Sequence, residues 1–460
     1  GAVFGWLPAI VWIVLGTIFI GGLHDLSSLV ISIRHGGLSI AQVANKYINK
    51  TTYKIFLLFI WFALVYVVSV FCDLAADTFF NEPSVAQTSV WYILVAIIFG
   101  VLVYKIKFNL LLSTLISLVF VLLGILFSLK FKFLYFPKQT WIWLLLVYSF
   151  LASILPVWFL LQPRDYLSSY FLYFTVIIGI FGLLFVKTKI LYPAFISFNS
   201  SIGTLFPFLF ITIACGAISG FHSLVSSGTT SKQLDNIKNA KFVAYGGMIL
   251  EGIVAAVALS TLMMINKGEF SNPQQVYALG ISKLSSVFGI DLEFGKTIGY
   301  LAISAFILTT LDTATRISRY ILQEFFGFTK SSLFIRTVFT VMSLVLPLIL
   351  LNLRLKDLGG NVVACWKIIW PLFGTTNQLL AALVLLVVYL WVKKQNFKNK
   401  IIVLLPSFFM LITALSALGW TLYMRIVKNV FDIIVFIGIV LFLLCIFIVV
   451  ESIKCIWQKS

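Results

Sequence analysis

Long apolar segments alternate with shorter polar connections along the whole 460-residue chain. Roughly 20 apolar residues in a helix cross a bilayer core about 30 Å thick. By that measure we predict thirteen membrane-spanning helices, at 3–33, 55–72, 89–104, 109–129, 141–161, 166–186, 205–227, 242–265, 297–322, 333–353, 362–391, 401–422 and 431–450. The two longest connections, 34–54 and 266–296, are too short to bury a core of their own. The pattern therefore predicts an all-α polytopic membrane protein in which residues 1–460 form one transmembrane domain.

Several of these spans contain residues that break helices. They are Gly21-Gly22, Pro156, Pro207, the pair Gly216 and Gly220, and Pro371. A break at membrane depth frees backbone groups that protein, water or ligand must satisfy. Transporters use such broken helices to bind substrate near the midplane of the bilayer. Interrupted spans therefore favour a transporter over a simple membrane anchor.

Composition agrees with a membrane protein, since 61% of the residues are hydrophobic, only 10% are charged, and the mean hydropathy is +1.09. The net charge is +18. Lys and Arg are more numerous in the connections on the side that the first span reaches, which the positive-inside rule assigns to the cytoplasm. We therefore expect a multi-pass protein of the plasma or inner membrane, surrounded by lipid and not bound to nucleic acid. Its loop 73–88 should be external and its C-terminus cytoplasmic.

The seventh predicted span contains a polar stripe. Ser219, His222, Ser223 and Ser226 recur at the spacing of one helical face. Ionisable residues inside a membrane are functional by default, so we expect this stripe to contact the substrate. His222 is the expected proton sensor, because the unperturbed pKa of histidine is about 6.5. The alternative is helix packing, with the serines bonded to backbone carbonyls.

Glu251 lies among apolar residues in the middle of the eighth span. A lone carboxylate there must be protonated or paired. Its candidate partners are His222, Lys367 and Arg316, and the sequence does not choose among them. We expect Glu251 to take part in ion or proton coupling.

Thr309, Thr310, Asp312 and Thr313 form a second polar cluster in the ninth span. Their hydroxyl and carboxylate oxygens suit a coupling Na⁺, which Thr309 and Thr313 would hold, and Asp312 alone could carry a proton instead. Asp312 and Arg316 are four residues apart and can pair on one helical face. An ion pair that anchors the helix end is the alternative reading of this cluster.

Four consecutive polar residues, Thr375, Thr376, Asn377 and Gln378, lie close to the centre of the eleventh span. Unmatched polar groups at that depth cost several kcal/mol each. We expect them to line a substrate cavity, and a hydrogen-bonded seam between helices is the alternative.

Two further pairs of polar residues end their helices. His24 and Asp25, near the inner face, favour a structural or gating role, whereas Arg164 and Asp165 read as a solvated turn. The five cysteines have no metal-site spacing. No cofactor is expected beyond a coupling Na⁺ or H⁺.

These segments resemble the carbon starvation protein A family of bacterial and archaeal membrane proteins. The resemblance rests on the stretches Phe4–Pro8, Ile20–Asp25, Leu155–Trp158, Gln162–Leu167, Pro207–His222, Gly228–Thr230, Thr309–Arg316 and Trp370–Gln378, and it extends to about residue 391. The family carries a Gly-His-His-Phe-Ala segment and a Gly-Ala-Gly-Pro run upstream of these stretches. This chain begins after them, so we expect it to be N-terminally truncated relative to the family.

The resemblance implies a secondary active transporter with an inverted-repeat core of five plus five helices and some extra helices, as in the amino acid–polyamine–organocation superfamily. It also implies import of a small carboxylate such as pyruvate, or of short peptides, under carbon starvation, driven by proton or sodium symport. The alternatives are a membrane-embedded hydrolase and a non-transporting nutrient sensor. No enzyme is expected, because the chain contains no HExxH, GxSxG or Walker sequence. The oligomeric state stays open.

Overall fold

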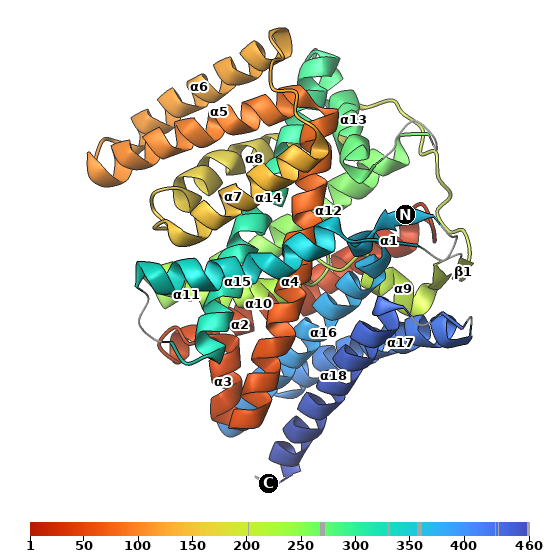
Figure 1. Ribbon diagram of the computed structural model, residues 1–460. Helices are drawn as coiled ribbons and strands as arrows, with labels where there is room; N and C mark the ends of the chain where they lie inside the picture. The colour runs from red at the N-terminus through yellow and green to blue at the C-terminus, as the bar shows by residue number, and fades with distance from the viewer. Residues whose placement is uncertain are drawn as a thin grey trace.

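The computed structural model describes residues 1–200, 202–266, 272–328, 332–356, 361–427, 429–430 and 432–457. The predicted cytoplasmic end, Ser460, lies outside these residues. In the described part the chain is almost entirely helical (Figure 1). Its two short antiparallel hairpins pair β1 (Asn199–Ser200) with β2 (Gly203–Thr204) and β3 (Arg354–Lys356) with β4 (Val362–Ala364).

The first half of the chain forms α1 (Trp6–Leu15), η1 (Gly16–Gly21), α2 (Gly22–Arg34), α3 (Ile40–Tyr47), α4 (Lys50–Asn81), α5 (Pro83–Gly100), η2 (Val101–Lys105), α6 (Leu110–Lys130), α7 (Lys138–Ile154), α8 (Leu161–Phe185), α9 (Leu205–Thr212), α10 (Gly220–Val225) and η3 (Ser226–Thr230). The second half forms α11 (Ser231–Gln233), η4 (Ile237–Asn239), η5 (Lys241–Gly246), α12 (Gly247–Met263), α13 (Pro273–Ser286), α14 (Leu292–Phe325), α15 (Leu333–Asn352), α16 (Cys365–Lys394), α17 (Ile401–Val427) and α18 (Ile433–Trp457). The elements η1, η2, η3 and η5 are π-helical.

Within the described residues, 11 helices are long and apolar enough to cross a membrane, which makes this an all-α polytopic membrane protein. The predicted count of thirteen is not confirmed. Of the two remaining predicted spans, 141–161 corresponds to α7, which has 17 residues. The other, 205–227, is divided between the short helices α9 and α10.

The predicted connections contain more helix than expected. The connection 34–54 includes α3, and 266–296 includes α13. The predicted external loop 73–88 is helical apart from Glu82, because α4 continues to Asn81 and α5 begins at Pro83. Carboxylates at the end of α4 are paired there: Lys138 Nζ lies 2.9 Å from Asp73 Oδ2 and 3.1 Å from Asp77 Oδ1. This pairing lets the helix extend past its apolar part.

The predicted breaks are only partly correct. The chain leaves the helical path between α7 and α8, around Pro156, and between α9 and α10, which includes Gly216. At Gly21-Gly22 the helix continues, because the glycines allow close packing: a Cβ on Gly21 would lie 2.4 Å from Ala217 O. α16 continues through position 371, since neighbouring groups in a membrane protein can satisfy the one backbone bond that a proline removes.

The most buried spans are α4, α14 and α16. In Figure 1, α5–α8 gather toward one end of the molecule and α16–α18 toward the opposite end, with the long α4 passing between them. α4 packs along α14, and α16 packs along α17. Two glycines let the broken span approach α16: a Cβ on Gly220 would lie 2.3 Å from Asn377 O, and one on Gly374 would lie 2.5 Å from Ile211 O.

We expect Gly220→Ala to destabilise the protein, because the added methyl group would meet the α16 backbone, which cannot rotate away. Overpacking of this kind costs about 1–3 kcal/mol, so the melting temperature of the purified protein should fall. Gly419→Ala, where a Cβ would meet nothing within 4 Å, is the control and should leave the melting temperature unchanged or slightly higher. Equal melting of Gly220→Ala and the parent would contradict this close contact.

Candidate functional site

The break between α9 and α10 is held by the side chain of Asn377 on α16. Asn377 Oδ1 accepts hydrogen bonds from the backbone N–H of Phe221 (3.1 Å) and from Ser219 Oγ (3.4 Å). Asn377 Nδ2 donates to Cys215 Sγ at 3.6 Å. One amide group therefore satisfies three polar groups of the broken segment.

The other residues of the 375–378 group have different surroundings. Gln378 Nε2 donates to Phe210 O of α9 at 3.1 Å, and Thr376 Oγ1 donates to Leu372 O of its own helix at 2.6 Å. Thr375 is buried. The group thus forms mainly a hydrogen-bonded seam between α16 and the broken span, the alternative reading of the sequence. Of its members, Asn377 also faces the polar cavity described next.

A polar cavity of about 320 Å³ lies beside the break, among α2, α4, α10, α12, α14 and α16. Its polar lining residues are Asp25, Cys215, Ser219, His222, Ser226, Thr230, Glu251, Thr310 and Asn377. Its aromatic lining residues are Phe71, Phe221, Phe306 and Phe373. Among the described residues no Lys or Arg lines it. Residues from the seventh, ninth and eleventh predicted spans, far apart in sequence, therefore meet at one cavity.

His222 lies between two carboxylates in the wall of this cavity. Its Nδ1 is 2.7 Å from Asp25 Oδ2, and its Nε2 is 2.9 Å from Glu251 Oε2. The side chain of His222 is 23% exposed and that of Glu251 is 20% exposed, whereas that of Asp25 is 6% exposed. Three helices, α2, α10 and α12, are thus joined through one imidazole. A proton on His222 would offset one of the two carboxylate charges.

These contacts answer one question that the sequence left open. Glu251 pairs with His222, whereas Lys367 is exposed and Arg316 Nη2 donates to the carbonyl oxygens of Ala152 and Leu155 at the end of α7. Asp25, for which the sequence favoured a structural or gating role, also lines the cavity.

The serine stripe does not form one continuous face. Ser219 precedes α10 and has extended backbone, and Ser226 begins the π-helix η3, so the regular spacing is interrupted on both sides. Ser219 and Ser226 line the cavity. Ser223 is fully buried, and its hydroxyl donates to Gly220 O at 2.7 Å. Ser223 is therefore a packing residue.

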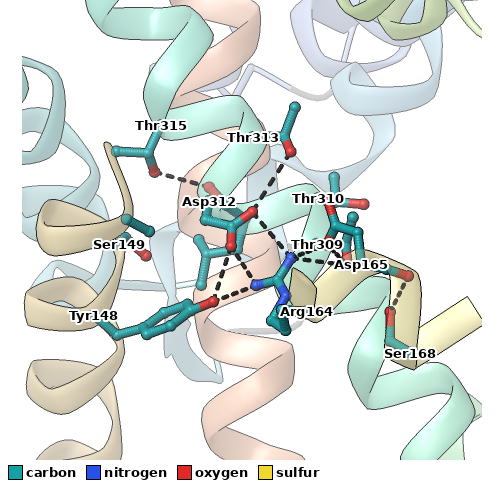
Figure 2. A network of polar contacts seen from close by, with 12 residues as sticks. Tyr148, Ser149, Arg164, Asp165, Ser168, Thr309, Thr310, Asp312, Thr313 and Thr315 are labelled. Carbon is teal, nitrogen blue, oxygen red and sulfur yellow. Dashed lines mark hydrogen bonds and ion pairs between the residues drawn. The ribbon is translucent and has the colours of Figure 1, made fainter. Parts of the chain in front are cut away.

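A second charged cluster joins α14 to α7 and α8 (Figure 2). Arg164 of α8 and Asp312 of α14 are both completely buried and form an ion pair. The hydroxyl of Tyr148, on α7, donates to Asp312 Oδ2 at 2.9 Å and also accepts from Arg164. Arg164 Nη2 lies 2.5 Å from Asp165 Oδ1 and donates to Thr309 Oγ1 at 3.0 Å. The cluster ties α7, α8 and α14 together.

One prediction about these residues is wrong, and the ion pair that the sequence offered as an alternative is formed with a different partner. Arg164 and Asp165 are not a solvated turn, because both lie in α8 and Arg164 is buried against α14. Asp312 pairs with Arg164 and not with Arg316, whose guanidinium caps the carbonyl end of α7. Sequence reasoning missed Tyr148 entirely, and it undervalued a signal that was present, since a buried arginine in a membrane protein nearly always has a specific partner.

The threonines of the ninth predicted span are divided between the two sites. Thr309 Oγ1 donates to Asp165 Oδ1 at 3.1 Å, and Thr313 Oγ1 lies 3.5 Å from Asp312 Oδ1. Thr310 faces the other way and lines the polar cavity. The guanidinium of Arg164 lies where a coupling cation beside Asp312 and Thr309 would bind.

We expect Arg164→Gln and Asp312→Asn each to destabilise the protein by about 3–5 kcal/mol, because each leaves one buried charge without its partner. The double variant should lose less than the sum of the two single changes. Thermal unfolding of the four proteins in one detergent gives the coupling energy. Lys454→Gln, at the exposed Glu451–Lys454 pair, is the control and should melt like the parent; additive losses would contradict the buried pair.

Comparisons with known proteins agree with this architecture. The family model described as "Carbon starvation protein CstA" matches residues 1–274 and 269–417. "Peptide transporter CstA" of Bacillus subtilis is 30% identical over 94% of this chain and 79% of its own length. "Pyruvate/proton symporter BtsT" of Escherichia coli is 28% identical over 92% of this chain and 71% of its own length.

Among solved structures, the crystal structure of a manganese transporter of Eremococcus coleocola covers 99% of this chain and 96% of its own length. Its TM-score is 0.40 and its sequence identity 13%, a likeness too low to carry an argument. The family match, in contrast, extends over most of the chain and includes both charged clusters. The chain belongs to the carbon starvation protein CstA family.

Proposed function

We propose that this chain is a proton-coupled secondary transporter that imports short peptides. The observation that carries the proposal is the position of His222, held between Asp25 and Glu251 in the wall of a cavity inside the membrane domain. The names of its relatives, a peptide transporter and a pyruvate/proton symporter, support the same class of function. Alternating access would proceed around this cavity, as in other transporters with broken helices.

The charge of the cavity gives the coupling its physical basis. With His222 neutral, Asp25 and Glu251 place two negative charges in a site where the described lining residues include no Lys or Arg. Unpaired charges are costly at such a site. A proton on His222 offsets one carboxylate, and the ammonium group of a substrate can offset the other. Proton and substrate then favour each other's binding, and this linkage is reciprocal.

The same charges favour a peptide over pyruvate as the substrate. A peptide presents a protonated α-amino group to the carboxylates, whereas pyruvate brings only negative charge. An apolar cavity of about 260 Å³ adjoins the polar one and shares Val67, Phe221, Phe373 and Asn377 with it. It would receive an apolar side chain of the peptide. Pyruvate is the second candidate, because protonated His222 could bind its carboxylate and one relative is named a pyruvate symporter.

We propose the proton, not sodium, as the coupling ion. The carboxylate of Asp312 is already paired with Arg164, and Thr309 takes part in the same cluster. A sodium site at Thr309 and Thr313 would have to displace the guanidinium. The distribution of Lys and Arg further supports a cytoplasmic C-terminus at the plasma membrane.

We expect His222→Ala to abolish pH-driven accumulation in proteoliposomes. Without the imidazole the cavity cannot take up the proton that offsets Asp25 or Glu251. His222→Gln, which keeps hydrogen-bonding groups, should lose accumulation but retain exchange of labelled for unlabelled substrate. His35→Gln is the control, because His35 bonds Ile31 O and Tyr47 outside the cavity; it should accumulate substrate normally. Normal pH-driven uptake by His222→Ala would refute the proposed coupling site.

Labelled dialanine should accumulate when the outside is more acidic, and pyruvate should accumulate much less. N-acetylation of dialanine should reduce uptake about tenfold or more, because it removes a charge-assisted hydrogen bond worth roughly 1.5–3 kcal/mol. The measurement is initial uptake of each compound at equal concentration and equal pH difference. Strong pyruvate uptake without dialanine uptake would reject the peptide and favour the second candidate.

A further inference from the structure

His24 continues the chain of titratable groups that begins at Glu251. His24 Nδ1 lies 2.8 Å from Asp25 Oδ1, and the other oxygen of Asp25 faces His222. One carboxylate is thus shared by two imidazoles. The four groups, Glu251, His222, Asp25 and His24, form one connected line across α12, α10 and α2.

His24 is completely buried, and its Nε2 has no hydrogen-bond partner. When the ring is neutral and Nδ1–H donates to Asp25, Nε2 presents a free lone pair in the protein interior. A proton at Nε2 converts the ring into an imidazolium that is paired with the Asp25 carboxylate.

The surroundings supply no competing cation. Of the elements packed against α2, α10 contributes His222 and α12 contributes Glu251. Lys232 of α11 and Lys241 of η5 are exposed. Within the described residues, the ion pairs of Asp25 and Glu251 are formed with histidines alone. Two carboxylates and two imidazoles therefore make a cluster that is electrically neutral only after it has taken up two protons.

We propose that His24 is a second proton-binding site of this transporter and that the cluster carries two protons for each substrate molecule. The inference rests on the proposed function, because His222 is the first of the two sites. A proton on His24 offsets Asp25 and leaves the proton on His222 to offset Glu251. The two protons bind from the more acidic outer side together with the substrate and leave with it on the inner side, so that the cluster is ready for the next cycle.

The test measures the ratio of protons to substrate in proteoliposomes that contain a pH-sensitive dye, with labelled dialanine as the probe. Valinomycin and equal potassium on both sides leave the pH difference as the only driving force. For the parent protein, the logarithm of the accumulation ratio should rise with the pH difference with a slope of two. His24→Gln keeps an N–H donor for Asp25 but cannot take up a proton, so its slope should fall to one. His35→Gln is the matched control and should keep a slope of two.

The possible outcomes separate the proposed role of His24 from the proposed role of His222. A slope of one in the parent overturns the inference without needing any variant. A slope of two that His24→Gln leaves unchanged assigns His24 a structural role and also overturns it. Loss of coupling in His222→Gln together with an unchanged slope in His24→Gln leaves the proposed function intact. Unchanged coupling in both variants refutes the inference and the proposed function together.

Discussion

The break between α9 and α10 is the constraint on which the rest of the site depends. Backbone groups freed by a broken helix have no water to bond with in the hydrocarbon region, so protein must satisfy them. Asn377 does so from α16, through bonds to Ser219, Phe221 and Cys215. Because α10 starts anew at Gly220, its first turn directs His222 toward α2 and α12. Close approach at Gly220 and Gly374 keeps this arrangement against α16.

The two charged clusters hold α14 and its neighbours in different ways. On one side, the Arg164–Asp312 pair and Tyr148 fix α14 to α7 and α8 through completely buried groups. On the other side, the cavity wall formed by Thr310 and Phe306 of α14 faces His222 and its carboxylates. The contacts among α2, α10 and α12 pass through imidazoles, whose charge changes with pH. Under the proposed function, α14 thus lies between a firmly paired half and a half whose contacts change with protonation.

The sequence predicted the polytopic helical class, because apolar length is a local signal. Intramembrane polar groups also pointed to some of the residues that line the cavity, namely Ser219, His222, Ser226, Glu251, Thr310 and Asn377. The sequence did not predict partners across the fold. Arg316 was a possible partner for Asp312 because the two are one turn apart, but the packing of α8 against α14 brings in Arg164 from 148 residues away. The role predicted for Asp25 rested on its position near the end of the first span. That position does not show which helices α2 contacts.

Local pattern also overestimated the regularity of the broken span. Four polar residues at helical spacing predicted one face, but a break before Gly220 and a π-helix after Val225 shift Ser219 and Ser226 relative to Ser223. Neither feature is visible in the spacing, and the break depends on bonds from Asn377 of α16. The partner of Glu251 illustrates the same limit. All three candidate residues could pair with a carboxylate, and only the packing of α10 against α2 and α12 shows that His222 is the partner.

The acidic lining of the cavity has an electrical consequence. A dipeptide at neutral pH carries no net charge, so every proton that accompanies it moves one positive charge across the membrane. Pyruvate with one proton would move none. Each charge that crosses a membrane potential of 100 mV is worth about 2.3 kcal/mol. A proton-coupled peptide importer of the proposed kind would therefore draw on the voltage of an energised cell, and its accumulation of peptide would continue when the inside and outside pH are equal.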